Sequence, residues 1–221
     1  MPRVKVPRKS TNVDMTAMCD VAFLLLTFFM LATKFKPDDP VKVKTPSSVS
    51  SDIVPDKNAL QVLFDKDGKV FFTYNDPDNV LPLIDQLNTA ENLGLTPAEE
   101  KNFTRIVENQ GIGVPISSLK SLLDLDPDAV KEVKQPGIPM PDSAHNELRI
   151  WVSTLLKADG GKQPDNVLIK GDNQAKYPEF KEVIRAFTDN KVFHFKLVTA
   201  MSDAPVGSAL WEKLRKLAGG K

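Results

Sequence analysis

One apolar stretch decides how this chain is organised: residues 15–35 read MTAMCDVAFLLLTFFMLATKF. On a helix that rises about 1.5 Å per residue, the stretch is roughly 31 Å long, which is close to the hydrocarbon thickness of a bilayer. The sequence therefore predicts a transmembrane helix over residues 13–35. The remainder of the 221-residue chain is polar and long enough to form a soluble domain with its own core.

An acidic side chain, Asp20, lies inside this apolar stretch. A carboxylate at that depth costs about 2.5–3.5 kcal/mol on insertion scales, so an ionisable residue in a membrane segment indicates a functional site. Thr16, Asp20 and Thr27 fall on one stripe of the helix. We find no second spanning segment in the sequence and therefore expect helices of other chains to face this stripe.

We expect Asp20 to carry protons, with the hydroxyls of Thr16 and Thr27 beside its route. The alternative is that Asp20, only about 8 Å from the start of the helix, is simply hydrated from the membrane surface.

The residues before the apolar stretch are basic. Residues 1–12 contain Arg3, Lys5, Arg8 and Lys9 and no acid, which predicts a cytoplasmic amino-terminal tail and a carboxy-terminal domain in the periplasm. A cleaved signal peptide is the competing interpretation, because the run from Val21 to Ala32 has the length of an apolar signal core. Against it stand the long preceding segment, the acidic interruptions and the missing small-residue cleavage site.

The composition argues against several classes of function. The net charge is zero, so the body that follows the basic tail has an excess of acids, which disfavours nucleic-acid binding. With one cysteine and two histidines, the sequence predicts neither an internal disulfide nor a metal site or other cofactor. We also find no phosphate-binding loop and no nucleophile motif, so we do not expect an enzyme.

The polar chain after the helix divides into a linker, a domain and a tail. Residues 36–57 are rich in Pro and Ser and predict a tether. Within it, Val41-Lys42-Val43-Lys44 alternates as an edge strand would, although an extended linker fits equally well. We expect a domain over residues 58–200 and a tail over 201–221, which contains a weak amphipathic helix at 209–216.

The pattern of the domain predicts a two-layer α+β fold with helices on one face of a mixed sheet. We expect these elements in order: a hairpin at 59–64 and 70–73, short helices within 76–141, a helix around 148–156, a strand at 166–170, a helix from Pro178 and a final strand at 192–199. One helix should begin at Thr96, because Thr96-Pro97-Ala98-Glu99 has the spacing of a capping box.

The membrane stretch resembles that of a known family. Residues 14–21, DMTAMCDV, followed by LLLTFFM at 24–30, are similar to the membrane helix of the ExbD/TolR biopolymer-transport family. Thr16 and Asp20 match its motif in place, whereas Asp14 and Ala17 stand where the family usually has Asn and Pro. The order of elements in the domain, and the segment from Val167 to Asp172 followed by Tyr177, also resemble the family.

The resemblance implies an ExbD-like subunit of an inner-membrane proton-driven motor, with Asp20 as the proton carrier. It also implies a dimer of these helices inside a ring of ExbB-like multi-span channel subunits, and a TonB-like energy transducer as client. Val41, Val43 and Tyr177 are the candidate docking residues for a partner. Residues 76–141 are interpreted as a helical insertion into the family's domain.

Three alternative hypotheses for the function remain. A TolR-like subunit would use the same motor for envelope integrity. A flagellar-type stator subunit would need a larger peptidoglycan-binding domain. A membrane-anchored binding module would use Asp20 only for a helix–helix hydrogen bond, without proton transport.

Overall fold

The computed structural model describes residues 15–32, 39–49, 58–142, 145–203, 205–209 and 211–212. The chain forms two compact units, Met1–Lys36 and Pro37–Lys221. The predicted cytoplasmic tail and Asp14 lie outside the described residues. The same holds for residues 33–38, where the predicted membrane helix ends, and for residues 50–57 of the predicted linker.

The first unit contains helix α1, Met15–Ala32. It is the one helix among the described residues that is long and apolar enough to cross a membrane, with a mean hydropathy of 2.0. Its 18 residues correspond to about 27 Å of helix. None of its side chains is buried.

The second unit is built on a four-stranded mixed sheet with the strand order β3-β2-β4-β5. The strands are β2 Ala59–Phe64, β3 Val70–Asn75, β4 Asn166–Gly171 and β5 Lys196–Leu197. Strands β2 and β3 form the predicted antiparallel hairpin, while β4 and β5 add in parallel. The Asp65 carboxylate closes the hairpin turn by accepting the N–H groups of Asp67 and Lys69, both at 2.9 Å.

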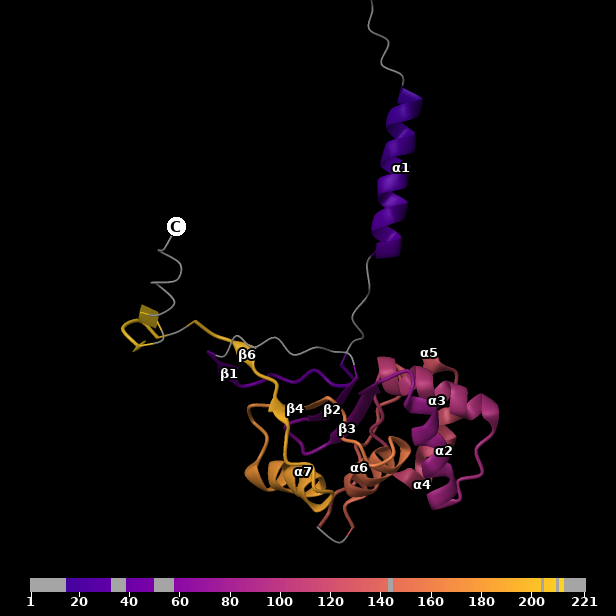
Figure 1. Cartoon of the computed structure of the whole chain (residues 1–221), viewed down its shortest axis with the longest axis vertical. Coiled ribbons are helices and arrows are strands. Elements are labelled where there is room, and N and C mark those ends of the chain that lie inside the picture. The colour runs from indigo at the N-terminus through magenta and orange to yellow at the C-terminus, as the bar shows by residue number, and fades with distance from the viewer. Residues whose placement is uncertain are drawn as a thin grey trace, which may run out of the picture. The chain divides into compact units, whose positions relative to one another are not determined.

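Helices cover one face of this sheet, as predicted. They are α2 Val80–Glu91, α3 Pro97–Asn109, α4 Ile116–Leu123, α5 Pro127–Val130, α6 Glu147–Ala158 and α7 Tyr177–Asp189. Helix α6 packs beside α7 and against α2, and α3 packs on β3 (Figure 1). The Trp151 ring lies at the centre of this layer, 5.1 Å from the ring of Phe72 and 6.0 Å from that of Phe103.

The predicted capping box starts α3. The Thr96 hydroxyl accepts the Glu99 N–H, and the Glu99 carboxylate accepts the Thr96 N–H. Two free N–H groups of the first turn are thereby satisfied. Pro97 stands at the first helical position, where its missing N–H costs nothing.

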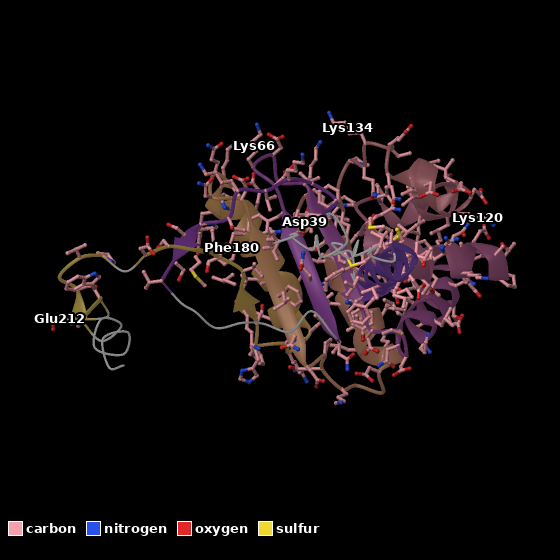
Figure 2. The ribbon with its side chains drawn as sticks, turned by 90° about the horizontal axis from the view of Figure 1, so that it is seen from above. Asp39, Lys66, Lys120, Lys134, Phe180 and Glu212 are labelled. Atoms are coloured by element: carbon pink, nitrogen blue, oxygen red, sulfur yellow. The ribbon has the colours of Figure 1, made fainter. Side chains whose placement is uncertain are left out.

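The other face of the sheet is also covered, which the two-layer prediction did not include. Leu63, Phe71 and Leu168 on this face are almost fully buried. The backbone at Gly113 lies so close to the Phe71 ring that an added Cβ would come within 2.2 Å of it. Asp39 forms an ion pair with Lys170 and lies over the strands in the view from above (Figure 2). The 39–49 segment therefore belongs to the folded domain.

Two predicted strands are placed differently. Of the two interpretations of residues 41–44, an edge strand or a linker, the structure favours the second, because these residues form no strand and the pairing falls on β1, Ser47–Ser48. Strand β1 pairs in parallel with β6, Ala200–Met201. Strands β1 and β6 are far apart in the sequence, so the local alternation of apolar and polar residues does not predict their pairing.

The final strand is shorter than the predicted 192–199. Lys191 adopts a left-handed conformation at φ 62°, and the Val192 N–H bonds back to the Phe187 carbonyl at 2.9 Å. These two residues complete the end of α7, residues 192–195 form no strand, and β5 begins at Lys196. Of the predicted tail helix, Ala209, Trp211 and Glu212 are helical, and the rest lies outside the described residues.

Candidate functional site

The membrane part of the candidate site is a polar stripe on α1. Thr16, Asp20 and Thr27 share one side of the helix, since they are separated by four and seven residues. The Thr27 hydroxyl donates to the Leu24 carbonyl at 2.9 Å, which satisfies its proton within the helix and leaves the oxygen able to accept. The sequence of α1 contains no Lys, Arg or His, so any cation that pairs with Asp20 must come from elsewhere.

The second part of the candidate site is the 39–49 segment of the soluble domain. Val41 and Val43 are half-buried, whereas Lys42 and Lys44 are exposed. The Lys44 N–H donates to the Asp172 carboxylate at 2.9 Å, and the Asn173 N–H donates to the Lys44 carbonyl at 2.8 Å. These two bonds hold the segment on the turn between β4 and α7.

Asp172 is a residue that the sequence reasoning missed as part of this site. Its carboxylate accepts the N–H of Gln174 as well as that of Lys44, and these backbone donors lower the pKa of Asp172. An Asp directly after a strand-ending Gly, in Gly171-Asp172-Asn173, is a turn signal. That signal locates the turn but not its bond to Lys44, which is distant in sequence.

Tyr177 is the first residue of α7 and directly follows this turn. Its side chain is 72% exposed. The turn at 172–176 therefore positions both parts of the predicted docking surface: the segment with Val41 and Val43, which is held through Lys44, and the exposed ring of Tyr177. Val41 and Val43 are themselves partly covered in this arrangement.

Metal-binding side chains do not gather in the described ranges. There, no group of three or more His, Cys, Asp or Glu side chains is arranged to hold a metal ion. His145 pairs with Asp142 on the surface at 3.0 Å, and His194 is exposed. The polar stripe of α1 and the 39–49 segment are thus the two features that point to a function.

The apolar helix and the small mixed-sheet domain together define a membrane-anchored protein with a folded polar body. The sequence model of the biopolymer transport protein ExbD/TolR family matches residues 7–121, more than half of the chain. The chain belongs to the ExbD/TolR family. Members of this family are transport motor subunits rather than enzymes, and they generally work with ExbB/TolQ-type channel partners.

The matched range contains α1, the β2–β3 hairpin, α2 and α3, and it ends within α4. The matched range thus includes part of residues 76–141, and the interpretation of these residues as an insertion stays a prediction. The resemblance of residues 147–200 to the family's domain also stays a prediction, because these residues lie outside the matched range. No curated protein and no solved structure matches the chain.

Proposed function

We propose that this chain is an ExbD-like subunit of an inner-membrane motor, which uses the proton motive force to drive TonB-dependent transport across the outer membrane. The observation that carries the proposal is Asp20, an acid within an apolar spanning helix of an ExbD/TolR family member. The basic residues of the 1–12 tail support a cytoplasmic amino terminus and a periplasmic domain.

Asp20 converts proton transfer into movement through its change of charge. A neutral carboxyl group tolerates an apolar environment, whereas an ionised one requires a polar partner. Uptake of a proton from the periplasmic side, and its release to the cytoplasm, therefore changes which face of α1 is favoured against its neighbours. Each charge that crosses 100 mV releases about 2.3 kcal/mol, enough to bias a helix rotation.

The partners follow from what α1 lacks. Because α1 has no basic residue, the groups that face ionised Asp20 belong to other chains, here two α1 helices inside a ring of ExbB-like channel subunits. Thr16 and Thr27 offer hydroxyls on the same stripe, beside the proton route. The motion passes to a TonB-like transducer, which docks on Val41, Val43 and Tyr177.

The decisive test replaces Asp20 with Asn in the full chain, co-expressed with its channel subunit. Asparagine still forms helix–helix hydrogen bonds but does not release a proton. We expect gradient-driven uptake and proton flux in reconstituted vesicles to be lost, while assembly with the channel subunit persists. Cys19→Ser, at the same depth, is the matched control and should retain both activities. Undiminished proton flux in Asp20→Asn would overturn the carrier role.

The docking proposal has a separate test. Tyr177→Ala should weaken cross-linking of the domain to the transducer, because it removes a largely exposed aromatic ring without loss of core packing. Val133→Ala removes another exposed apolar side chain, in the bend after α5, and should leave cross-linking unchanged. Equal effects of the two substitutions would contradict docking at Tyr177. Measuring envelope leakage beside uptake in the same strains separates an ExbD-like from a TolR-like role.

A further inference from the structure

The segment of residues 39–49, which lies between α1 and the four-stranded sheet in the sequence, is fixed to the soluble domain from its first residue. Asp39 forms an ion pair with Lys170 of the inner strand β4. The Asp39 side chain is 35% exposed and the Lys170 side chain is 19% exposed, so water screens this pair less than it screens a fully exposed one. Figure 2 shows Asp39 over the strands of the sheet. The first described residue after α1 is therefore fastened to the sheet.

The next residue, Pro40, packs on the chain beside β3. A Cβ atom added to Gly111 would come within 3.2 Å of the Pro40 Cγ and within 2.7 Å of the Thr73 hydroxyl. Gly111 has a φ of 72°, which glycine adopts without strain, and the following residue, Ile112, forms a bridge with Phe72 of β3. The start of the segment thus contacts β4 through Asp39 and the region of β3 through Pro40.

The middle of the segment is held by backbone hydrogen bonds. The Lys44 N–H donates to the Asp172 carboxylate at 2.9 Å, and the Asn173 N–H donates to the Lys44 carbonyl at 2.8 Å. Val41 and Val43 are half-buried, and residues two apart share one side of an extended chain. One side of the segment therefore lies on the domain, and the segment ends in the pairing of β1 with β6.

These contacts shorten the free chain between α1 and the domain. Helix α1 ends at Ala32, and the four-stranded sheet begins at Ala59. If all residues between them formed a free tether, this tether would reach about 90 Å when extended. Because Asp39 is already bound to the domain, only residues 33–38 precede the first contact, a reach of about 25 Å. A short connection transmits a movement of α1 that a long free tether would absorb.

We infer that residues 39–49 are the coupling arm of this chain: Lys170 and Asp172 hold the arm on the domain, and movement of α1 enters the domain at Asp39 rather than at β2. The inference rests on the proposed function, since a coupling arm needs a motor, and it extends that function by naming the residues that pass the motion on. Lys170 and Asp172 are positioning residues, because they act through the arm and not on the proton.

Two insertions of the same spacer test the arm in the full chain, assembled with its channel subunit. In one variant a six-residue Gly-Ser spacer stands between Pro37 and Asp38, ahead of the arm. In the other it stands between Ser51 and Asp52, behind the arm. Each adds about 20 Å of extended chain. We expect the first spacer to lower gradient-driven uptake about fivefold at unchanged proton flux, and the second to leave both at the wild-type level. A free tether would respond equally to both spacers, so equal uptake in the two variants would overturn the inference.

An exchange of charges tests the ion pair. Lys170→Asp alone brings two carboxylates together, and Asp39→Lys alone brings two ammonium groups together, so each should release the start of the arm and lower uptake at unchanged proton flux. The combined variant restores an ion pair and should recover uptake, which mere damage to the fold would not allow. Lys131→Asp breaks the exposed pair with Asp128 and is the matched control. Equal uptake in Lys170→Asp and Lys131→Asp would contradict the role of the ion pair.

Amide hydrogen exchange in the same complex reports directly on the position of the arm. The Lys44 and Asn173 N–H groups are both hydrogen-bonded, so both should exchange slowly in the wild type and in the two spacer variants. The Lys44 N–H should exchange faster in Lys170→Asp. Fast exchange at Lys44 in the wild-type complex would show that the arm does not lie on the domain, and the inference would fail.

The outcomes distinguish this inference from the proposed function. If the Asp20→Asn variant keeps its proton flux, the proposed motor is wrong, and the coupling arm with it. If proton flux depends on Asp20 but the two spacers change uptake equally, the motor stands and the coupling arm is wrong.

Discussion

Helix α1 and the soluble domain use the same apolar residues in opposite ways. In the domain, rings such as Trp151, Phe72 and Phe103 are fully buried against one another. In α1, none of the 18 residues is buried, and Phe23, Phe28 and Leu31 are all more than half exposed. The domain therefore supplies its own solvent-free interior, whereas α1 is apolar and exposed, as expected of a helix that crosses a membrane.

The carboxylates of the two regions also differ in whether the chain itself supplies their hydrogen-bond partners. Asp65 and Asp76 are buried in the domain, and each accepts hydrogen bonds from its own chain, Asp76 from the Tyr74 hydroxyl at 3.1 Å and the Asn79 amide at 2.9 Å. Among the described residues, no hydrogen bond or ion pair reaches the Asp20 side chain. The buried carboxylates of the domain are satisfied by the chain itself and are structural, whereas Asp20 lies in an apolar helix and is the candidate for function.

The largest effect is expected from emptying the core of the domain. Trp151→Ala should lower the free energy of unfolding by about 3–5 kcal/mol, because a large buried ring is replaced by a cavity. Urea unfolding of the full chain in detergent, followed by loss of helical circular dichroism, measures this. Phe28→Ala in α1 is the control and should leave the domain's transition unchanged. Trp151→Phe should cost less, since the indole N–H has no hydrogen-bond partner; an equal loss would contradict the cavity explanation.

A matched pair of lysines distinguishes exposure to lipid from exposure to water. Leu25 in α1 is 52% exposed and Leu81 in α2 is 50% exposed. Leu25→Lys should disfavour membrane insertion by about 2.5–3.5 kcal/mol, whereas Leu81→Lys should change domain stability by no more than about 0.5 kcal/mol. The inserted fraction after carbonate extraction measures the first effect, and urea unfolding measures the second. Insertion of Leu25→Lys at the wild-type level would show that α1 does not face lipid at this position.

The close approach of backbone and ring on the second face of the sheet gives the next effect. Gly113→Ala should destabilise the domain by about 1–3 kcal/mol, because the added methyl group overlaps the Phe71 ring and the packing must shift. Thermal unfolding of the full chain in detergent measures the loss. The double variant with Phe71→Leu should recover part of the stability, since it removes the ring that collides. Strictly additive losses would contradict the collision.

Much of this fold is predictable from local sequence. The stripe of Leu148, Trp151, Val152 and Leu155 gives α6, and all four side chains are buried. The hairpin and the Thr96 capping box also follow from a few adjacent residues. Asp20 is identifiable as a candidate because an acid within an apolar run is costly whatever surrounds it.

The remainder depends on contacts that local patterns do not contain. The strand position at Ser47–Ser48 is set by Ala200–Met201, and the 39–49 segment is held by Asp172. The alternation of apolar and basic residues at 41–44 predicts that Val41 and Val43 turn inward. It does not predict that strand pairing begins only at Ser47. The same limit applies to β5, which pairs with the distant strand β4 only at Lys196 and Leu197.

A smaller effect is expected at the start of α3. Thr96→Ala removes the hydroxyl that accepts the Glu99 N–H and should cost about 1 kcal/mol of domain stability. Urea midpoints of the full chain in detergent measure the loss. Ser121→Ala, at an exposed position inside α4, removes a hydroxyl that caps no helix start and is the control. An equal shift in both variants would show that the capping box contributes nothing specific.

The smallest effect concerns the acid pair Glu99 and Asp124, which joins the start of α3 to the end of α4. A hydrogen bond with Glu99 raises the pKa of Asp124 above its ordinary 3.8, while the N–H and hydroxyl of Thr96 lower the pKa of Glu99. Lys120, the nearby cation, favours the ionised form of both acids.

Because the pKa of Asp124 is raised on folding, its contribution to stability is present at acidic pH and is lost as the pH rises through the folded value. Glu99 contributes in the opposite sense, with stability that is lost as the pH falls. Asp124→Asn keeps a donor for Glu99 but does not titrate. Relative to this variant, the wild type should therefore gain stability between neutral pH and about pH 4, as measured by urea midpoints at both values. A difference that is independent of pH would show that the two acids share no proton, and that the α3–α4 contact rests on packing alone.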